Sequence, residues 1–179
     1  MSSQLVYIDT NVFAILLLPH PQSQDPCVKQ AYRFIEDIES GKYTGITSSL
    51  TEMEYRGVVK RRLSEKKGCQ VSTQEEDAAM YDFSNFIQEL GIGVMDADIV
   101  ALDRSANTVQ LRLFTLSANT VQNSSPCYIN NQWKMIRCVD ALTINIAVKT
   151  KADLFATFDR GFKGLSNSFI TPLIISEVY

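Results

Sequence analysis

Two short apolar runs, each ending on an aspartate, constrain this sequence more than any other feature. LVYI at 5–8 leads into Asp9, and FATF at 155–158 leads into Asp159. Runs that are apolar on both faces are typical of strands buried between two layers, as in parallel sheets. Parallel strands end at one edge of their sheet, which is where open α/β sheets hold their ligands. An aspartate there also caps a following helix, so the first run alone leaves both interpretations open.

Segments with helical and strand periodicity alternate along the rest of the chain. Apolar spacing, capping residues and glycine stops predict helices at 11–18, 26–42, 47–67, 73–90, 96–106 and 139–151. Apolar, β-prone segments predict strands at 5–8, 43–47, 92–95, 152–159 and 172–176. A capping box of Thr73 and Glu76 is expected to open the fourth helix, and Asp96 or Asp98 to cap the fifth. The alternation indicates an α/β fold with a mainly parallel central sheet.

Length and composition exclude several classes of protein. At 179 residues, the chain is expected to form a single domain over 1–179. No apolar segment approaches the roughly 20 residues of a membrane span, and the apolar start lacks the basic region of a signal peptide, so we expect a cytoplasmic protein. The four cysteines form no CxxC pair and His20 is the one histidine, which argues against zinc and against histidine-dependent nucleophilic catalysis.

Two further acids fall where a carboxylate is harder to explain. In the helix at 47–67, Glu54 lies on the apolar face. Glu52 lies on the opposite side, where pairing with Arg56 and a capping box with Ser49 account for it. Asp140 opens a helix that is apolar nearly all round, and a helix cap explains it about as well as a functional role does.

The acids have no matching set of buried bases. Crowded carboxylates repel one another and take up protons unless a cation neutralises them. The pattern therefore indicates a divalent metal, and oxygen ligands favour magnesium or manganese over zinc. The acids in question are Asp9, Glu54, Asp140 and Asp159.

Three segments, in this order, resemble the PIN domain, the nuclease fold of VapC-type toxins: VYIDTNV at 6–12, SSLTEMEYRGV at 48–58 and DALTINIAVKTKADLFATFDRGF at 140–162. The resemblance implies a three-layer α/β/α sandwich and a magnesium- or manganese-dependent ribonuclease that hydrolyses phosphodiester bonds with metal-activated water. It also implies a homodimer and, for a toxin, a small antitoxin partner. The family's acidic quartet falls on Asp9, Glu54, Asp140 and Asp159, and its accompanying polar residues fall on Asn11 and Thr157.

The resemblance also implies roles for these residues. Asp9 and Asp140 are expected as direct metal ligands, and Asp159 as a direct or water-mediated ligand. Glu54 is expected to serve a second metal ion or a water bridge. Thr157 is expected to position the water or a ligand, and Asn11 to hold Asp9 in place.

Because the net charge is −3, binding of RNA must depend on a local basic patch. The candidates lie near the end of the helix at 47–67 and beside Asp159: Lys60, Arg61, Arg62, Lys66, Lys67, Arg160 and Lys163. A solvated helix end explains the first group equally well, since cations are favoured near a helix C-terminus.

Residues 105–138 depart from the family pattern and are expected to form an atypical insertion. They contain SANTVQ twice, at 105–110 and 117–122, and the polar stretch at 117–138 is expected to be a long loop or lid.

Two other functions compete with the nuclease. A non-catalytic PIN-like scaffold that binds RNA or protein would keep the fold without the activity. A phosphotransfer domain would use Asp9 as a nucleophile. Haloacid dehalogenase-like enzymes need a second acid where this chain has Asn11, and receiver domains need a late lysine and paired early acids that the sequence lacks.

Overall fold

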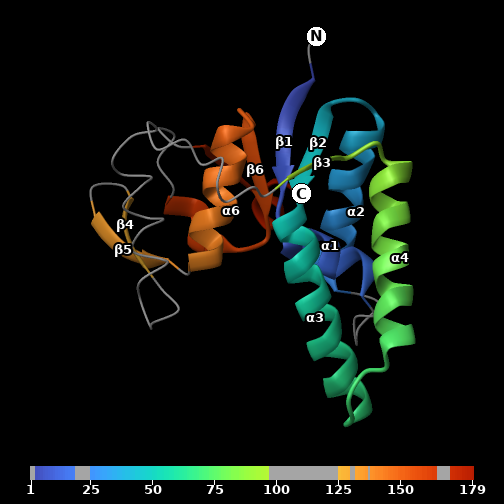
Figure 1. The fold of residues 1–179 in the computed structure, drawn as a ribbon. Coiled ribbons are helices and arrows are strands. Elements are labelled where there is room, and N and C mark those ends of the chain that lie inside the picture. The colour runs from blue at the N-terminus through green and yellow to red at the C-terminus, as the bar shows by residue number, and fades with distance from the viewer. Residues whose placement is uncertain (1–2, 19–24, 97–124, 130–131, 137, 165–169) are drawn as a thin grey trace.

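The computed structural model describes residues 3–18, 25–96, 125–129, 132–136, 138–164 and 170–179. Five parallel strands form the central sheet in the order β3-β2-β1-β6-β7. Helices lie on both faces of this sheet (Figure 1), so the expected three-layer α/β/α architecture is confirmed. The strands are β1 (Gln4–Ile8), β2 (Tyr43–Ser48), β3 (Gly93–Met95), β6 (Leu154–Thr157) and β7 (Thr171–Ile174).

Two clusters of buried apolar side chains form the core. Successive strand residues point to opposite faces, so β1 places Val6 and Ile8 in one cluster and Tyr7 in the other. The first cluster lies under four helices: α1 (Thr10–Leu17), α2 (Pro26–Glu39), α3 (Ser49–Lys67) and α4 (Thr73–Glu89). The second lies under α6 (Cys138–Lys149) and the 3₁₀ helix η2 (Arg160–Gly164). The short α7 (Ile175–Val178) packs on α2.

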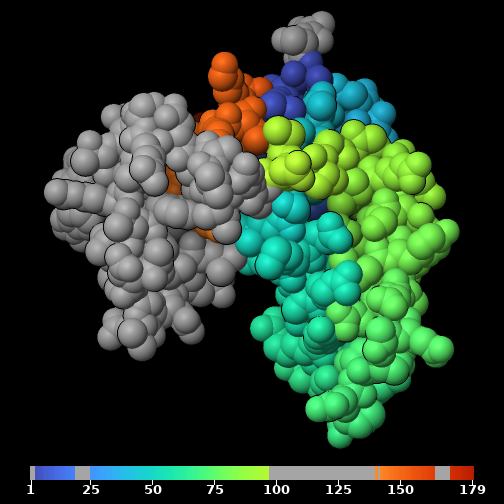
Figure 2. Space-filling model, in the orientation of Figure 1, coloured from blue at the N-terminus to red at the C-terminus, as the bar shows by residue number. Residues whose placement is uncertain are grey.

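Helices α3 and α4 project together beyond the rest of the described chain (Figure 2). The expected capping box of Thr73 and Glu76 is wrong by one residue, because Ser72 is the N-cap of α4 and its box partner is Glu75. The carboxylate of Glu76 is used elsewhere: it accepts from Arg56 at 3.0 Å and lies 3.2 Å from the ammonium of Lys60. The cap of α4 is therefore a local capping box one residue earlier than expected, and Glu76 instead joins α4 to α3.

The start of α3 also differs from expectation. The N-cap is Ser48, not Ser49, and it makes no side-chain cap. Its hydroxyl is instead 2.6 Å from the hydroxyl of the fully buried Tyr7, which also lies 3.2 Å from that of Thr51. These bonds attach the first turn of α3 to the central strand β1.

The loop expected over 117–138 is wrong for part of its length. Strands β4 (Ser125–Ile129) and β5 (Gln132–Ile136) pair there as an antiparallel hairpin, since both segments carry aromatic and β-branched residues. The helix expected at 96–106 and both copies of SANTVQ lie outside the described residues, apart from Asp96. None of the described helices is both long and apolar enough to cross a membrane.

Strands β1, β2 and β6 end at one edge of the sheet. Tyr7 pairs in register with Ile46 of β2 and Phe155 of β6. Beyond the last strand pair, the backbone N–H of Asp9 donates to the carbonyl of Ala156 at 3.0 Å. The residues that follow these strands therefore come together, although they are far apart in the sequence.

Candidate functional site

Asp9 lies at the centre of this edge, between β1 and α1. Its Oδ1 accepts from the backbone N–H of Thr10 at 2.8 Å, so Asp9 is the N-cap of α1. A helix cap was one of the two interpretations of the sequence. Its Oδ2 accepts from the hydroxyl of Thr157 at 2.7 Å. The cap and the functional interpretation are therefore compatible, because each uses a different carboxylate oxygen.

Thr157 and Asn11 hold the two strand ends together. The fully buried hydroxyl of Thr157 accepts from Nδ2 of Asn11 at 2.8 Å and from the backbone N–H of Asp159 at 3.0 Å. Oδ1 of Asn11 accepts from the backbone N–H of Phe158 at 3.1 Å. The structure thus brings Thr157, the polar residue that the resemblance pairs with the last acid, to Asp9, and brings Asn11 to Thr157.

Glu54 reaches the same edge from α3. It is half-buried, and its Oε2 accepts from the hydroxyl of Thr10 at 2.7 Å. Thr10 therefore contacts two acids at once, with its backbone at Asp9 and its side chain at Glu54. Sequence reasoning assigned no role to Thr10. Its position directly after Asp9 could have indicated such a role. The same position is equally typical of an ordinary residue at the start of a helix.

Asp159 lies on the other side of Thr157 and is oriented by the turn that follows it. Its Oδ1 accepts from the backbone N–H of Gly161 at 2.7 Å. A Cβ atom at Gly161 would lie 2.9 Å from that oxygen, so any larger residue there displaces the carboxylate. Gly161 is a second residue that sequence reasoning did not single out.

Asp140 is half-buried in the first turn of α6, and its negative charge acts on Asp9. Burial raises the pKa of Asp9 to about 7, against hydrogen bonds from Thr157 and Thr10 that lower it. The charges of Glu54 and Asp140 contribute to the same rise. Three of the four expected acids are therefore close enough to influence one another, and Asp159 is joined to Asp9 through the Thr157 hydroxyl.

The donor set fits a hard divalent cation, because it consists of carboxylate oxygens whose mutual repulsion a cation would relieve. Within the described ranges, however, no three carboxylate, thiol or imidazole side chains converge closely enough to surround one ion.

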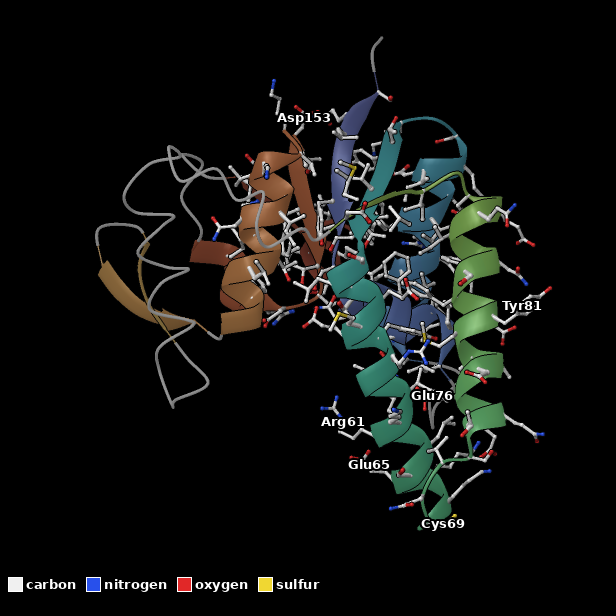
Figure 3. The ribbon with its side chains drawn as sticks, viewed as in Figure 1. Arg61, Glu65, Cys69, Glu76, Tyr81 and Asp153 are labelled. Atoms are coloured by element: carbon white, nitrogen blue, oxygen red, sulfur yellow. The ribbon has the colours of Figure 1, made fainter. Side chains whose placement is uncertain are left out.

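The expected RNA-binding residues have several different environments. Lys60 pairs with Glu76, and Arg62 donates to the carbonyl of Ala14 at 2.9 Å in the last turn of α1. Arg61 is exposed and points away from α4 (Figure 3).

The other basic candidates lie at the end of α3 and in η2. Lys66 is exposed, and Lys67 pairs with Glu75. In η2, Lys163 and Arg160 lie 3.0 and 4.0 Å from Glu177. The basic patch stays a prediction, with Arg61, Lys66, Arg160 and Lys163 among its exposed members and Arg62 bonded to α1.

No protein-family model matches the sequence, and no curated protein matches it significantly. Among solved structures, the chain is similar to Mycobacterium tuberculosis VapC20, a toxin that cleaves the sarcin-ricin loop. The sequences are 13% identical, the TM-score is 0.50, and the match covers 90% of this chain and 96% of VapC20. At this identity the likeness concerns the fold, and it confirms the PIN-like architecture that the sequence indicated.

Proposed function

We propose that this chain is a metal-dependent endoribonuclease that uses Asp9, Glu54, Asp140 and Asp159. The observation that carries the proposal is the environment of Asp9, where burial and two neighbouring carboxylates raise the pKa to about 7. Such a cluster costs stability unless a cation or a proton neutralises it, and perturbed acids of this kind gather at functional sites. The charged groups that most affect the pKa of Asp9 are the carboxylates of Glu54 and Asp140. Oxygen ligands of this kind favour Mg²⁺ or Mn²⁺.

In this proposal the four acids hold the metal, with Asp9 and Asp140 as direct ligands. A divalent cation held there would supply Lewis-acid activation of the scissile phosphate and of a water molecule. Thr157 orients Oδ2 of Asp9, and Asn11 in turn fixes Thr157 by its amide group. Gly161 orients the carboxylate of Asp159 through its backbone N–H. Asp9 must lose its proton to bind a cation, so protons compete with the metal and binding weakens as the pH falls below about 7.

RNA as the substrate and a toxin role are part of the same proposal. They are supported by the fold shared with VapC20, a toxin that cleaves an RNA loop, and by the exposed cations on α3 and η2. The proposal also includes a homodimer and a small antitoxin partner. Growth arrest upon expression of the wild type, but not of Asp140→Asn, would support the toxin role. Light scattering of the purified chain would measure its oligomeric state.

The nuclease is tested by cleavage of a labelled single-stranded RNA with Mg²⁺, Mn²⁺ or EDTA. We expect metal-dependent cleavage by the wild type, loss of cleavage in EDTA and loss of cleavage in Asp140→Asn. Asp153→Asn is the matched control: Asp153 accepts from the backbone of Leu5 at 2.8 Å, at the far end of the sheet (Figure 3). Equal cleavage by the wild type and Asp140→Asn would contradict the proposed site.

A non-catalytic, RNA-binding scaffold is the second candidate. The observation that favours it is the lack, among the described residues, of three ligands that converge on one point. This function predicts salt-dependent RNA binding by a folded protein that cleaves none of a varied set of RNAs. Cleavage in Mn²⁺ that EDTA abolishes would rule it out.

A further inference from the structure

Thr10 lies between the two acids that approach the site from different elements. Asp9 ends β1, whereas Glu54 lies in the second turn of α3, and the two residues belong to separate helix starts. Thr10 is 6% exposed, and both of its polar donors are used. Its N–H donates to Oδ1 of Asp9 at 2.8 Å and its hydroxyl to Oε2 of Glu54 at 2.7 Å.

The orientation of this side chain is well defined. The backbone N–H of Thr10 is the first of α1, and the Asp9 cap holds it in place. Threonine is branched at Cβ and therefore has few side-chain rotamers within a helix. A hydrogen bond to a carboxylate is also shorter and stronger than one between neutral groups. Thr10 thus holds Oε2 of Glu54 with its hydroxyl while its backbone N–H holds Oδ1 of Asp9.

We propose that Thr10 is a positioning residue that holds Glu54 at the separation from Asp9 that divalent-cation binding requires. The structure shows these carboxylates near one another but without a three-ligand cluster among the described residues, so their approach to an ion depends on how each is held. The inference rests on the proposed function, because it takes the quartet to bind a metal. It adds the hydroxyl that links the α3 acid to the β1 acid.

The test compares Thr10→Val with Thr10→Ser. Valine keeps the shape and the backbone N–H to Asp9 but removes the hydroxyl, whereas serine retains a hydroxyl. Mn²⁺ binding is measured by electron paramagnetic resonance of the free ion, without RNA. We expect Thr10→Val to weaken Mn²⁺ binding by about 10- to 100-fold, as is typical when a partner of a metal ligand is lost. Thr10→Ser should restore affinity close to that of the wild type.

A double-mutant cycle separates positioning from a general effect on folding. If Thr10 acts through Glu54, then Thr10→Val should have almost no further effect on Mn²⁺ affinity in a Glu54→Ala background. Far-ultraviolet circular dichroism at the assay temperature confirms that each variant is folded. Losses that add in the double mutant would overturn the inference, since Thr10 would then act independently of Glu54.

The outcomes distinguish this inference from the proposed function. Equal Mn²⁺ affinity in the wild type and Thr10→Val overturns the role of Thr10 and leaves the nuclease proposal standing. Mn²⁺ binding that follows the expected order without any RNA cleavage supports the role of Thr10 and contradicts the nuclease. A folded wild type that binds no Mn²⁺ overturns both.

Discussion

Asp9 and Glu76 are both acids largely withdrawn from solvent, yet their surroundings shift their pKa values in opposite directions. Burial raises the pKa of Asp9 to about 7, and the acids Glu54 and Asp140 add to this effect. Burial acts in the same direction on Glu76, but hydrogen bonds from Lys60 and Arg56 outweigh it and lower the pKa.

The two regions differ in whether the chain itself supplies a positive charge to neutralise the acid. Between α3 and α4, the acid has its counter-ions within the chain, so its charge favours the folded state. At the carboxyl edge of the sheet, the charge of Asp9 opposes folding until a cation or proton arrives. In the proposed function, stability and metal binding therefore depend on different parts of one fold.

The largest expected effect comes from removing the charge of Asp9. We expect Asp9→Asn to reduce RNA cleavage by about 100-fold or more, the scale on which loss of a charge-stabilising group usually acts. In the metal-free protein the same change should raise the melting temperature, because it removes repulsion with Glu54 and Asp140. Calorimetry and single-turnover cleavage measure the two effects. A variant that cleaves RNA at the wild-type rate would remove Asp9 from the site.

The next effect is the pH dependence of metal-free stability. The folded pKa of Asp9, about 7, exceeds the ordinary 3.8, so between these values the folded state binds more protons than the unfolded state. The contribution of Asp9 to stability is therefore present at low pH and is lost as pH rises through about 7. Denaturant unfolding in EDTA from pH 5 to 8 should show this loss in the wild type. A curve of the same shape for Asp9→Asn would assign the loss to another group.

Glu76 should show the opposite sign. Its folded pKa is lowered, so its contribution is present above the unfolded value, 4.5, and is lost as pH falls. At pH 7, Glu76→Gln should lower the melting temperature by about 2 to 4 °C, a shift ordinary for a modest interaction in a chain of this size. Asp77→Asn, on the exposed side of the same helix, is the control and should change little. Equal shifts for the two variants would mean that the α3–α4 ion pairs contribute nothing specific.

The smallest expected effect on stability concerns the hydroxyl of Tyr55 in α3. It is an exception to the comparison, because within the described ranges this buried polar group on the α3–α4 side lacks the kind of partner that Glu76 has. The hydroxyl of Tyr55 is buried, stacks with its ring on Phe83 and has no hydrogen-bond partner among the described residues. We expect Tyr55→Phe to leave the free energy of unfolding unchanged or to raise it by about 1 kcal/mol, since an unsatisfied hydroxyl is removed. Tyr81→Phe makes the same change at an exposed position (Figure 3) and should have no effect. A clear loss of stability in Tyr55→Phe alone would reveal a partner for its hydroxyl.

Local sequence patterns predicted the parts of this molecule that local physics determines. The strands ending at Asp9 and Asp159 follow from short apolar runs, and the position of Glu54 follows from helical spacing. The parallel order of the sheet follows from the alternation of elements. These features depend on side chains within one or two turns of each other.

Contacts between elements could not be read in this way. The pairing of Glu76 with Arg56 joins two helices, and the local spacing had instead assigned Glu76 to a cap with Thr73. The bond from Arg62 to the carbonyl of Ala14 likewise joins two helices, and no local pattern predicted it. The Thr10 hydroxyl was missed for the same reason, because its partner lies 44 residues away in the sequence.

The bond between Asp9 and Thr157 has a consequence for the synthesis of the protein. These residues are 148 positions apart, and β6 must pair with β1 before the two can meet. When α1 to α4 have been synthesised, Asp9 and Glu54 are therefore already part of the nascent chain, but Thr157 is not. Pairing over such separations is slow compared with the formation of local helices. Asp9 therefore gains its Thr157 partner only after β6 has been synthesised, when most of the chain has already left the ribosome.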